Sequence, residues 1–140
     1  MSFYLDTNVI VAMLTPEPFS ERAERFAIAN PDGLLVSDFA AAEFASVIAR
    51  RVRTRELRLD EGRDALIAFD VWRSRSARQI QTTAPDVAIV ETYLRRLDLP
   101  LLTPDAIHIA IAQRLGAALV TFDQQMASSA RVLGMAVTTP

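Results

Sequence analysis

Four acidic residues from distant parts of the sequence are the residues best suited to chemistry: Asp6, Glu43, Asp105 and Asp123. Carboxylates that meet in an open crevice can bind a divalent cation, which lowers the pKa of a coordinated water and offsets charge on a leaving oxygen. Such a set predicts hydrolysis of a phosphodiester bond, with one acid available as general base. The spacing does not assign the individual roles.

The stretch that ends at Asp123 predicts one helix followed by one strand. Thr103 is expected as the N-cap of the helix, and Gly116 as the residue that ends it. A helix of roughly 11 residues rises about 16 Å, and the strand at residues 117–122 returns about 20 Å. We therefore expect Asp123 to lie near Asp105.

Asp6 and Glu43 are placed by two other predicted elements. Asp6 follows a short apolar strand, residues 2–5, and precedes an apolar helix. Glu43 lies in a long helix that Ser37 is expected to cap, and its neighbours there are mostly Ala and Phe. Because a buried, unpaired carboxylate is costly, we expect a cation or a hydrogen-bond donor near Glu43.

Short strands alternate with helices along the whole chain. This order predicts an α/β fold: one domain, residues 1–140, with a central, mostly parallel sheet of four to five short strands and helices on both faces. Ligands bind beyond the carboxyl ends of the strands in such sheets. Further strands are expected at residues 34–36, 78–81 and 135–137, and further helices at residues 19–29, 59–73, 84–97 and 124–133.

The composition excludes several classes of protein. The chain has no cysteine and one histidine, and all 15 basic residues are arginine. Disulfides, cysteine-based zinc sites, Walker A loops and Schiff-base chemistry are therefore excluded. Oxygen ligands remain, and these suit Mg²⁺ or Mn²⁺. A net charge of −2 argues against bulk electrostatic coating of nucleic acid, so any such contact must be local.

Hydropathy bears on location and partners. Hydrophobic residues make up 51% of the chain, which favours some apolar contact with another chain. No apolar run reaches the roughly 18 residues of a membrane span, and no signal peptide is evident, so we expect a cytoplasmic protein with no membrane contact. The arginines from Arg50 to Arg58 indicate a solvated helix end or, alternatively, a phosphate-binding edge.

Each acid also has a structural explanation. Asp6 and Asp123 could cap helices, and Asp105 could complement a helix dipole. Together, however, they would converge and repel one another, so a bound cation is the simplest counter-charge. A non-catalytic binding module stays an alternative. A haloacid-dehalogenase-like phosphatase fits poorly. It needs a second Asp at the position of Asn8, and it needs a lysine, which this chain lacks.

Four neighbouring polar residues are expected to support the acids. Hydroxyl and amide groups can orient carboxylates by hydrogen bonds, although such residues also occur at helix and strand ends for structural reasons. A lone histidine in an apolar helix is more often a hydrogen-bonded core residue than a ligand. The supporting candidates are Thr7, Asn8, Thr121 and His108.

Taken as a set, these motifs resemble the PIN-domain nucleases, most closely the VapC-type ribonuclease toxins of toxin–antitoxin pairs. The motifs are YLDTNVIVAML, Glu43 in an Ala-rich helix, PDAIHIAIA and GAALVTFD. The resemblance implies a Mg²⁺- or Mn²⁺-dependent endoribonuclease that forms a homodimer and is inhibited by a small VapB-type antitoxin. Its catalytic and metal-binding residues fall on Asp6, Glu43, Asp105 and Asp123.

The resemblance leaves the substrate open, because residues 55–99 contain no motif that aligns with the family. An RNA-processing or DNA-directed PIN enzyme that is not a toxin is the main alternative within the nucleases.

Overall fold

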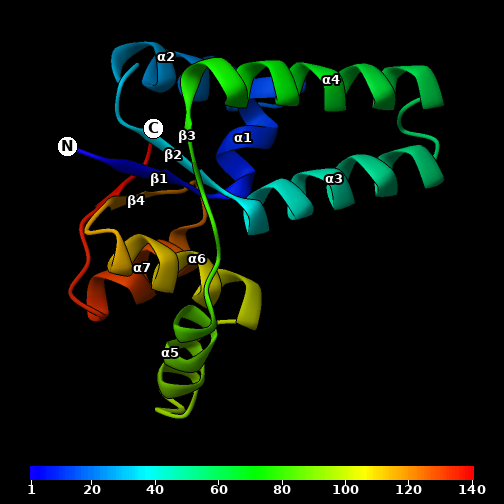
Figure 1. The fold of residues 1–140 in the computed structure, drawn as a ribbon. Helices are drawn as coiled ribbons and strands as arrows, with labels where there is room; N and C mark the ends of the chain where they lie inside the picture. Colours follow the sequence, from blue (N-terminus) through cyan, green and yellow to red (C-terminus); the bar gives the residue numbers. More distant parts are fainter.

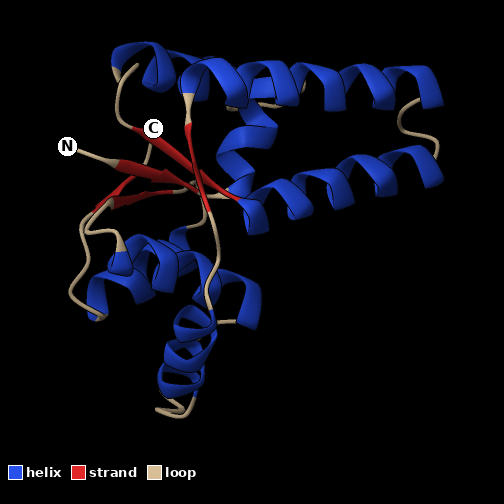
Figure 2. Ribbon diagram, in the orientation of Figure 1, coloured by secondary structure: helices blue, strands red, loops and turns tan.

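Five short parallel strands form one sheet at the centre of the computed structural model, which describes residues 1–140 (Figure 2). The strand order is β3-β2-β1-β4-β5, and every neighbouring pair is parallel. The predicted parallel α/β sheet is therefore confirmed. The strands are β1 (Phe3–Leu5), β2 (Leu34–Ser37), β3 (Arg78–Ile80), β4 (Ala118–Val120) and β5 (Val137–Thr138).

Seven helices cover both faces of this sheet (Figure 1). Helices α1 to α4 lie on one side, and α5, α6 and α7 lie on the other. They are α1 (Thr7–Leu14), α2 (Ser20–Ala29), α3 (Asp38–Arg53), α4 (Leu59–Ser76), α5 (Ala84–Leu94), α6 (Thr103–Arg114) and α7 (Gln124–Val132).

The sheet separates two hydrophobic cores, because successive side chains of a strand point to opposite faces. Tyr4 and Leu119 pack with α5, α6 and α7 in one core. Leu5 and Val120 pack with α1, α3 and α4 in the other. Strands buried on both faces therefore read as continuous apolar runs, as expected for a parallel sheet.

The starts of two helices test the sequence prediction. Ser37 caps α3 as predicted, because its hydroxyl accepts a hydrogen bond from the amide of Ala40. The prediction of Thr103 as N-cap was wrong: Thr103 is the first residue of α6, and Leu102 occupies the cap position without a side-chain bond. Pro104 has no amide hydrogen and is tolerated throughout the first turn, where amide groups lack intrahelical acceptors. The helix can therefore begin at Thr103, one residue earlier than expected.

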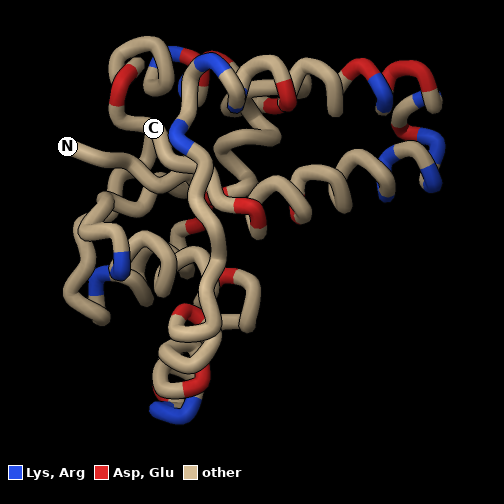
Figure 3. The backbone as a smooth tube through the Cα atoms, in the orientation of Figure 1, with Lys and Arg blue, Asp and Glu red and all other residues tan.

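Helices α3 and α4 project from the sheet as a hairpin whose far end is rich in arginine (Figure 3). The helices approach closely at Gly62, where a Cβ atom would lie 2.7 Å from Cγ2 of Val52. No helix in the structure is long and apolar enough to cross a membrane.

Candidate active site

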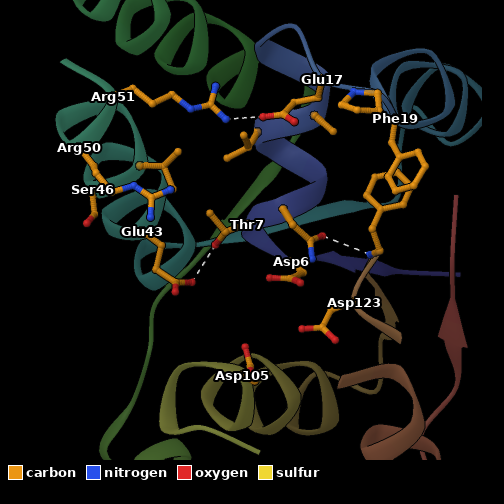
Figure 4. Close-up of a pocket in the computed structure, with 16 residues that line it drawn as sticks. Asp6, Thr7, Glu17, Phe19, Glu43, Ser46, Arg50, Arg51, Asp105 and Asp123 are labelled. Atoms are coloured by element: carbon orange, nitrogen blue, oxygen red, sulfur yellow. Dashed lines mark hydrogen bonds and ion pairs between the residues drawn. The ribbon is translucent and has the colours of Figure 1, made fainter. Parts of the chain in front are cut away.

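The four acids predicted from the sequence line one cavity of about 640 Å³ (Figure 4). Asp6 directly follows β1, and Asp123 follows β4 after Thr121 and Phe122. Glu43 projects from α3, and Asp105 lies in the first turn of α6. Thr7 and Asn8 also line this cavity. Elements from both ends of the sequence therefore meet at the carboxyl edge of the sheet, as parallel topology requires.

Asp6 is buried and does not cap a helix. It occupies the N-cap position of α1, but its side chain forms no capping bond. Instead its Oδ2 accepts a 2.7 Å hydrogen bond from the hydroxyl of Thr121, and its Oδ1 lies 3.6 Å from Nε2 of His108. Burial raises the pKa of Asp6, despite the opposing effects of His108 and Thr121.

Thr121 is fully buried and joins three segments through its hydroxyl. Besides donating to Asp6, Oγ1 accepts from the Asp123 amide at 3.0 Å and from the Asn8 side-chain amide at 3.2 Å. The Asn8 carbonyl in turn accepts from the Phe122 amide at 3.2 Å. The end of β4 is thereby fixed against the start of α1.

Glu43 receives two hydrogen-bond partners. The Thr7 hydroxyl donates to its Oε1 over 2.8 Å, and Nε2 of the buried His108 contacts the same oxygen. Burial alone would raise the pKa of Glu43, but the hydrogen bonds from His108 and Thr7 outweigh it and lower that pKa. Glu43 is partly exposed, and these two side chains are the partners that the sequence analysis expected for it.

Tyr4 holds the other side of the imidazole. Its hydroxyl lies 2.8 Å from Nδ1 of His108 and 2.7 Å from Oγ of Ser37. Burial raises the pKa of Tyr4, so the phenol stays protonated and remains a donor. Donation to Nδ1 leaves the proton of a neutral His108 on Nε2, facing Glu43. The sequence analysis missed Tyr4, although a tyrosine in a buried strand signals a hydroxyl that needs a partner.

Asp123 and Asp105 lie at the starts of neighbouring helices. Asp123 caps α7, because its Oδ1 accepts from the amides of Gln125 and Met126. Asp105 is partly buried, and its pKa is raised first by burial and then by the charges of Asp123 and Asp6. The electrostatic crowding expected from the sequence is therefore present at Asp105.

Comparison with known proteins decides the family. Residues 3–132 match the PIN domain. The chain belongs to the PIN-domain family. This PIN domain is 30% identical over 127 residues to ribonuclease VapC3 of Pyrobaculum aerophilum. The aligned region covers 91% of the chain and 93% of the relative. It is 32% identical to ribonuclease VapC46 of Mycobacterium tuberculosis, over 99% of the chain and 98% of the relative.

Solved structures share the fold of this PIN domain. VapC20 of Mycobacterium tuberculosis, described as a sarcin–ricin loop cleaving toxin, has a TM-score of 0.77 at 20% identity, with 99% of the chain and 100% of that protein covered. The DNA-bound VapBC complex of Salmonella typhimurium has a TM-score of 0.75 at 20% identity, with coverages of 99% and 98%. The predicted VapC-type resemblance is thus confirmed.

The donor set of this PIN domain suits a hard divalent ion, because the carboxylate oxygens of four acids face one crowded negative site. No three acidic or histidine side chains lie together at the spacing of a preformed metal site. Mg²⁺ commonly keeps several waters and contacts only one or two carboxylates, so this geometry fits such an ion.

The cavity of this PIN domain also includes residues that the sequence analysis did not connect with the acids. Ser46, Arg50 and Arg51 line it beyond Glu43, while Phe19 and Phe122 line its other end. Arg50 and Arg51 belong to the arginine run noted in the sequence. The two phenylalanines gave no signal, since isolated aromatics are usually core residues.

Proposed function

We propose that this PIN domain is a Mg²⁺- or Mn²⁺-dependent endoribonuclease and the toxin of a toxin–antitoxin pair. The observation that supports the proposal most is the gathering of Asp6, Glu43, Asp105 and Asp123 around one cavity. Two relatives at 30% and 32% identity are ribonucleases named VapC. One or two of these acids would bind the divalent ion directly, and the others would contact the waters that it keeps.

When bound, the ion supplies a Lewis acid and lowers the pKa of a coordinated water. The chain's own residues orient the ligands: Thr121 fixes Asp6, whereas Thr7 and His108 fix Glu43. An acid without a direct bond to the ion would be available to accept the proton of the attacking water. Without a cation, the same cavity would repel the phosphates of RNA.

Cleavage of RNA by the purified protein, freed of any partner, tests this proposal. Single-stranded RNA should be cut with Mn²⁺ or Mg²⁺, and EDTA should stop the reaction. Asp6→Asn and Asp105→Asn should abolish cleavage, whereas Asp64→Asn, at an exposed acid of α4 outside the cavity, should not. Cleavage that survives EDTA and both cavity substitutions would refute the proposal.

A small VapB-type antitoxin and a second copy of the chain are the partners we propose. The Salmonella neighbour is a VapBC complex, and this chain exposes apolar residues on α4 and α5, namely Ile67, Val71, Val87 and Ile89. Expression should arrest growth, and a neighbouring small open reading frame should relieve the arrest. Cleavage without growth arrest would favour an RNA-processing PIN enzyme. Light scattering would measure the oligomeric state.

A further inference from the structure

The cavity extends beyond the four acids in two directions that the proposed function does not use. Figure 4 shows Arg50 and Ser46 beyond Glu43, and Phe19 on the side of Asp123. The acids lie between a basic end and an aromatic end. A ligand that crosses the acids must therefore meet both chemistries.

The aromatic end presents a partly exposed ring, that of Phe19. The rings of Phe19 and Phe122 stack with centroids 4.8 Å apart and an interplanar angle of 28°. The guanidinium carbon of Arg22 lies 4.7 Å from the ring centroid of Phe19 and 5.4 Å from that of Phe122. The Arg22 guanidinium therefore packs over both rings of the pair.

Phe19 is the exposed member of the stacked pair. It is 43% exposed, although Phe122 behind it is partly buried. Exposed aromatic rings are the side chains on which unpaired nucleic-acid bases stack, and the second ring and the guanidinium pack against this one. Because the pair lines the same cavity as Asp123, the stacked base would lie next to the acids.

The basic end offers one free cation. Arg51 is held by an ion pair with Glu17 and a hydrogen bond to Thr15, so its charge is already compensated. Arg50 is exposed and takes part in none of the ion pairs of the chain. A free guanidinium beside a hydroxyl, that of Ser46, suits a phosphate.

We propose that the cavity binds single-stranded RNA across the four acids, with a base stacked on Phe19 and a backbone phosphate against Arg50. This inference rests on the proposed function and adds the residues that hold the nucleotides on either side of the acids. A paired base is already stacked inside its duplex and cannot lie on Phe19, so the site selects unpaired nucleotides. The net charge of the chain leaves such local contacts as the source of RNA affinity.

Binding of short RNA oligonucleotides that contain 2-aminopurine tests the aromatic contact. All proteins carry Asp105→Asn so that the RNA stays intact. Phe19→Ala should weaken binding by about tenfold or more and abolish the fluorescence quench that stacking causes. Phe19→Leu, which keeps an apolar contact with Phe122, should also lose the quench, and Phe19→Tyr should keep it. Ile28→Ala, at an exposed apolar residue of α2, the helix that Phe19 precedes, should change neither quantity.

Salt dependence tests the phosphate contact. In the same background, Arg50→Gln should reduce the slope of log affinity against log salt by about 0.7, the value for one phosphate contact with a single strand. Arg131→Gln, at an exposed arginine of α7 outside the cavity, should leave the slope unchanged.

Unchanged quench, affinity and slope in the Phe19 and Arg50 variants would overturn the inference. An aromatic pair that serves a protein partner would give that result. Failure of the proposed function is seen separately, as absence of cleavage by the unmodified chain with Mn²⁺, because the binding experiments do not depend on turnover.

Discussion

The hydroxyl of Thr121 donates a 2.7 Å hydrogen bond to Oδ2 of Asp6, and both side chains are buried. The bond joins the ends of the neighbouring strands β1 and β4, although the residues are 115 positions apart. Oγ1 of Thr121 also accepts a hydrogen bond from the amide of Asp123. One hydroxyl therefore orients the chain after β1 and the chain after β4. The two proposed ion ligands are thereby fixed by a group that does not line the cavity.

Replacement of Thr121 by valine should weaken Mn²⁺ binding about tenfold, the usual cost of losing a residue that orients a metal ligand. Loss of the donor also raises the pKa of Asp6 further, so the pH at which Mn²⁺ binds should move upward. Calorimetric titrations at several pH values measure both changes. Thr121→Ser keeps the hydroxyl and should restore both, whereas equal affinities for the valine and native proteins would contradict the account.

Asp105 should destabilise the protein at neutral pH when no divalent ion is bound. Its pKa is raised by burial and by the charges of Asp123 and Asp6, so its ionised form is disfavoured in the folded state. A carboxyl group whose pKa is higher in the folded state stabilises the protein at pH values below its pKa in the unfolded state, which is near 4. This stabilisation is lost as the pH rises through the pKa of the folded state. Asp105→Asn should therefore raise Tm at pH 7 in EDTA by roughly 2 °C, after allowance for solvent screening.

Mn²⁺ should reverse that order of stability. A ligand at 100 times its Kd stabilises a protein by about 2.7 kcal/mol. The Asp105→Asn variant, which should bind Mn²⁺ poorly, should gain little of this stabilisation. Thermal unfolding of both proteins with and without Mn²⁺ gives the comparison. A higher Tm for the native chain in EDTA would show that the carboxylates do not repel one another as the structure indicates.

Asp86 should be among the most stabilising polar residues outside the cavity. Its buried carboxylate accepts from Nε and Nη2 of Arg114 at 2.7 and 3.0 Å, and from the amide of Thr83 at 2.8 Å. Asp86→Ala removes this ion pair and the capping box of α5, and should lower the free energy of unfolding by about 3 kcal/mol. Urea unfolding measures the loss. Asp98→Ala, at an exposed ion pair, should cost far less than Asp86→Ala.

The same contacts of Asp86 set a pH dependence of opposite sign to that of Asp105. Burial opposes the shift, but the bonds from Arg114 and Thr83 lower the pKa of Asp86. A lowered carboxyl pKa gives stability that is present above the unfolded value and is lost as pH falls through the folded one. Acid unfolding of Asp86→Ala should accordingly depend less on pH below about pH 4 than that of the native chain.

The fold followed from the sequence because hydrophobic runs, turns and caps alternate with little ambiguity. Ser37 illustrates this, since a hydroxyl before an apolar helix has few other roles. Exact boundaries did not follow: the strand expected at residues 117–122 is only Ala118–Val120, because hydrogen-bonded pairing with the neighbouring strands decides where a strand ends.

The acids could be found because residues that follow parallel strands must meet at one edge of the sheet. Whether an acid caps a helix could not be decided from sequence, and the answer differs: Asp123 caps α7, whereas Asp6 instead accepts from Thr121. Tyr4 and Phe19 were missed for a physical reason. Their contacts depend on side-chain packing between elements, which the spacing of residues does not encode. The cytoplasmic location, the homodimer and the 1–140 domain limits stay predictions.

Mn²⁺ binding by the apoprotein tests most directly whether the four acids share one divalent ion. Electron paramagnetic resonance can count bound Mn²⁺ in the native chain and in Asp6→Asn, Glu43→Gln, Asp105→Asn and Asp123→Asn, with Asp64→Asn as control. We predict that each cavity substitution weakens binding at least tenfold and that the control binds as the native chain does. Mn²⁺ binding that is absent in the native chain, or unchanged in all four cavity variants, would contradict the account.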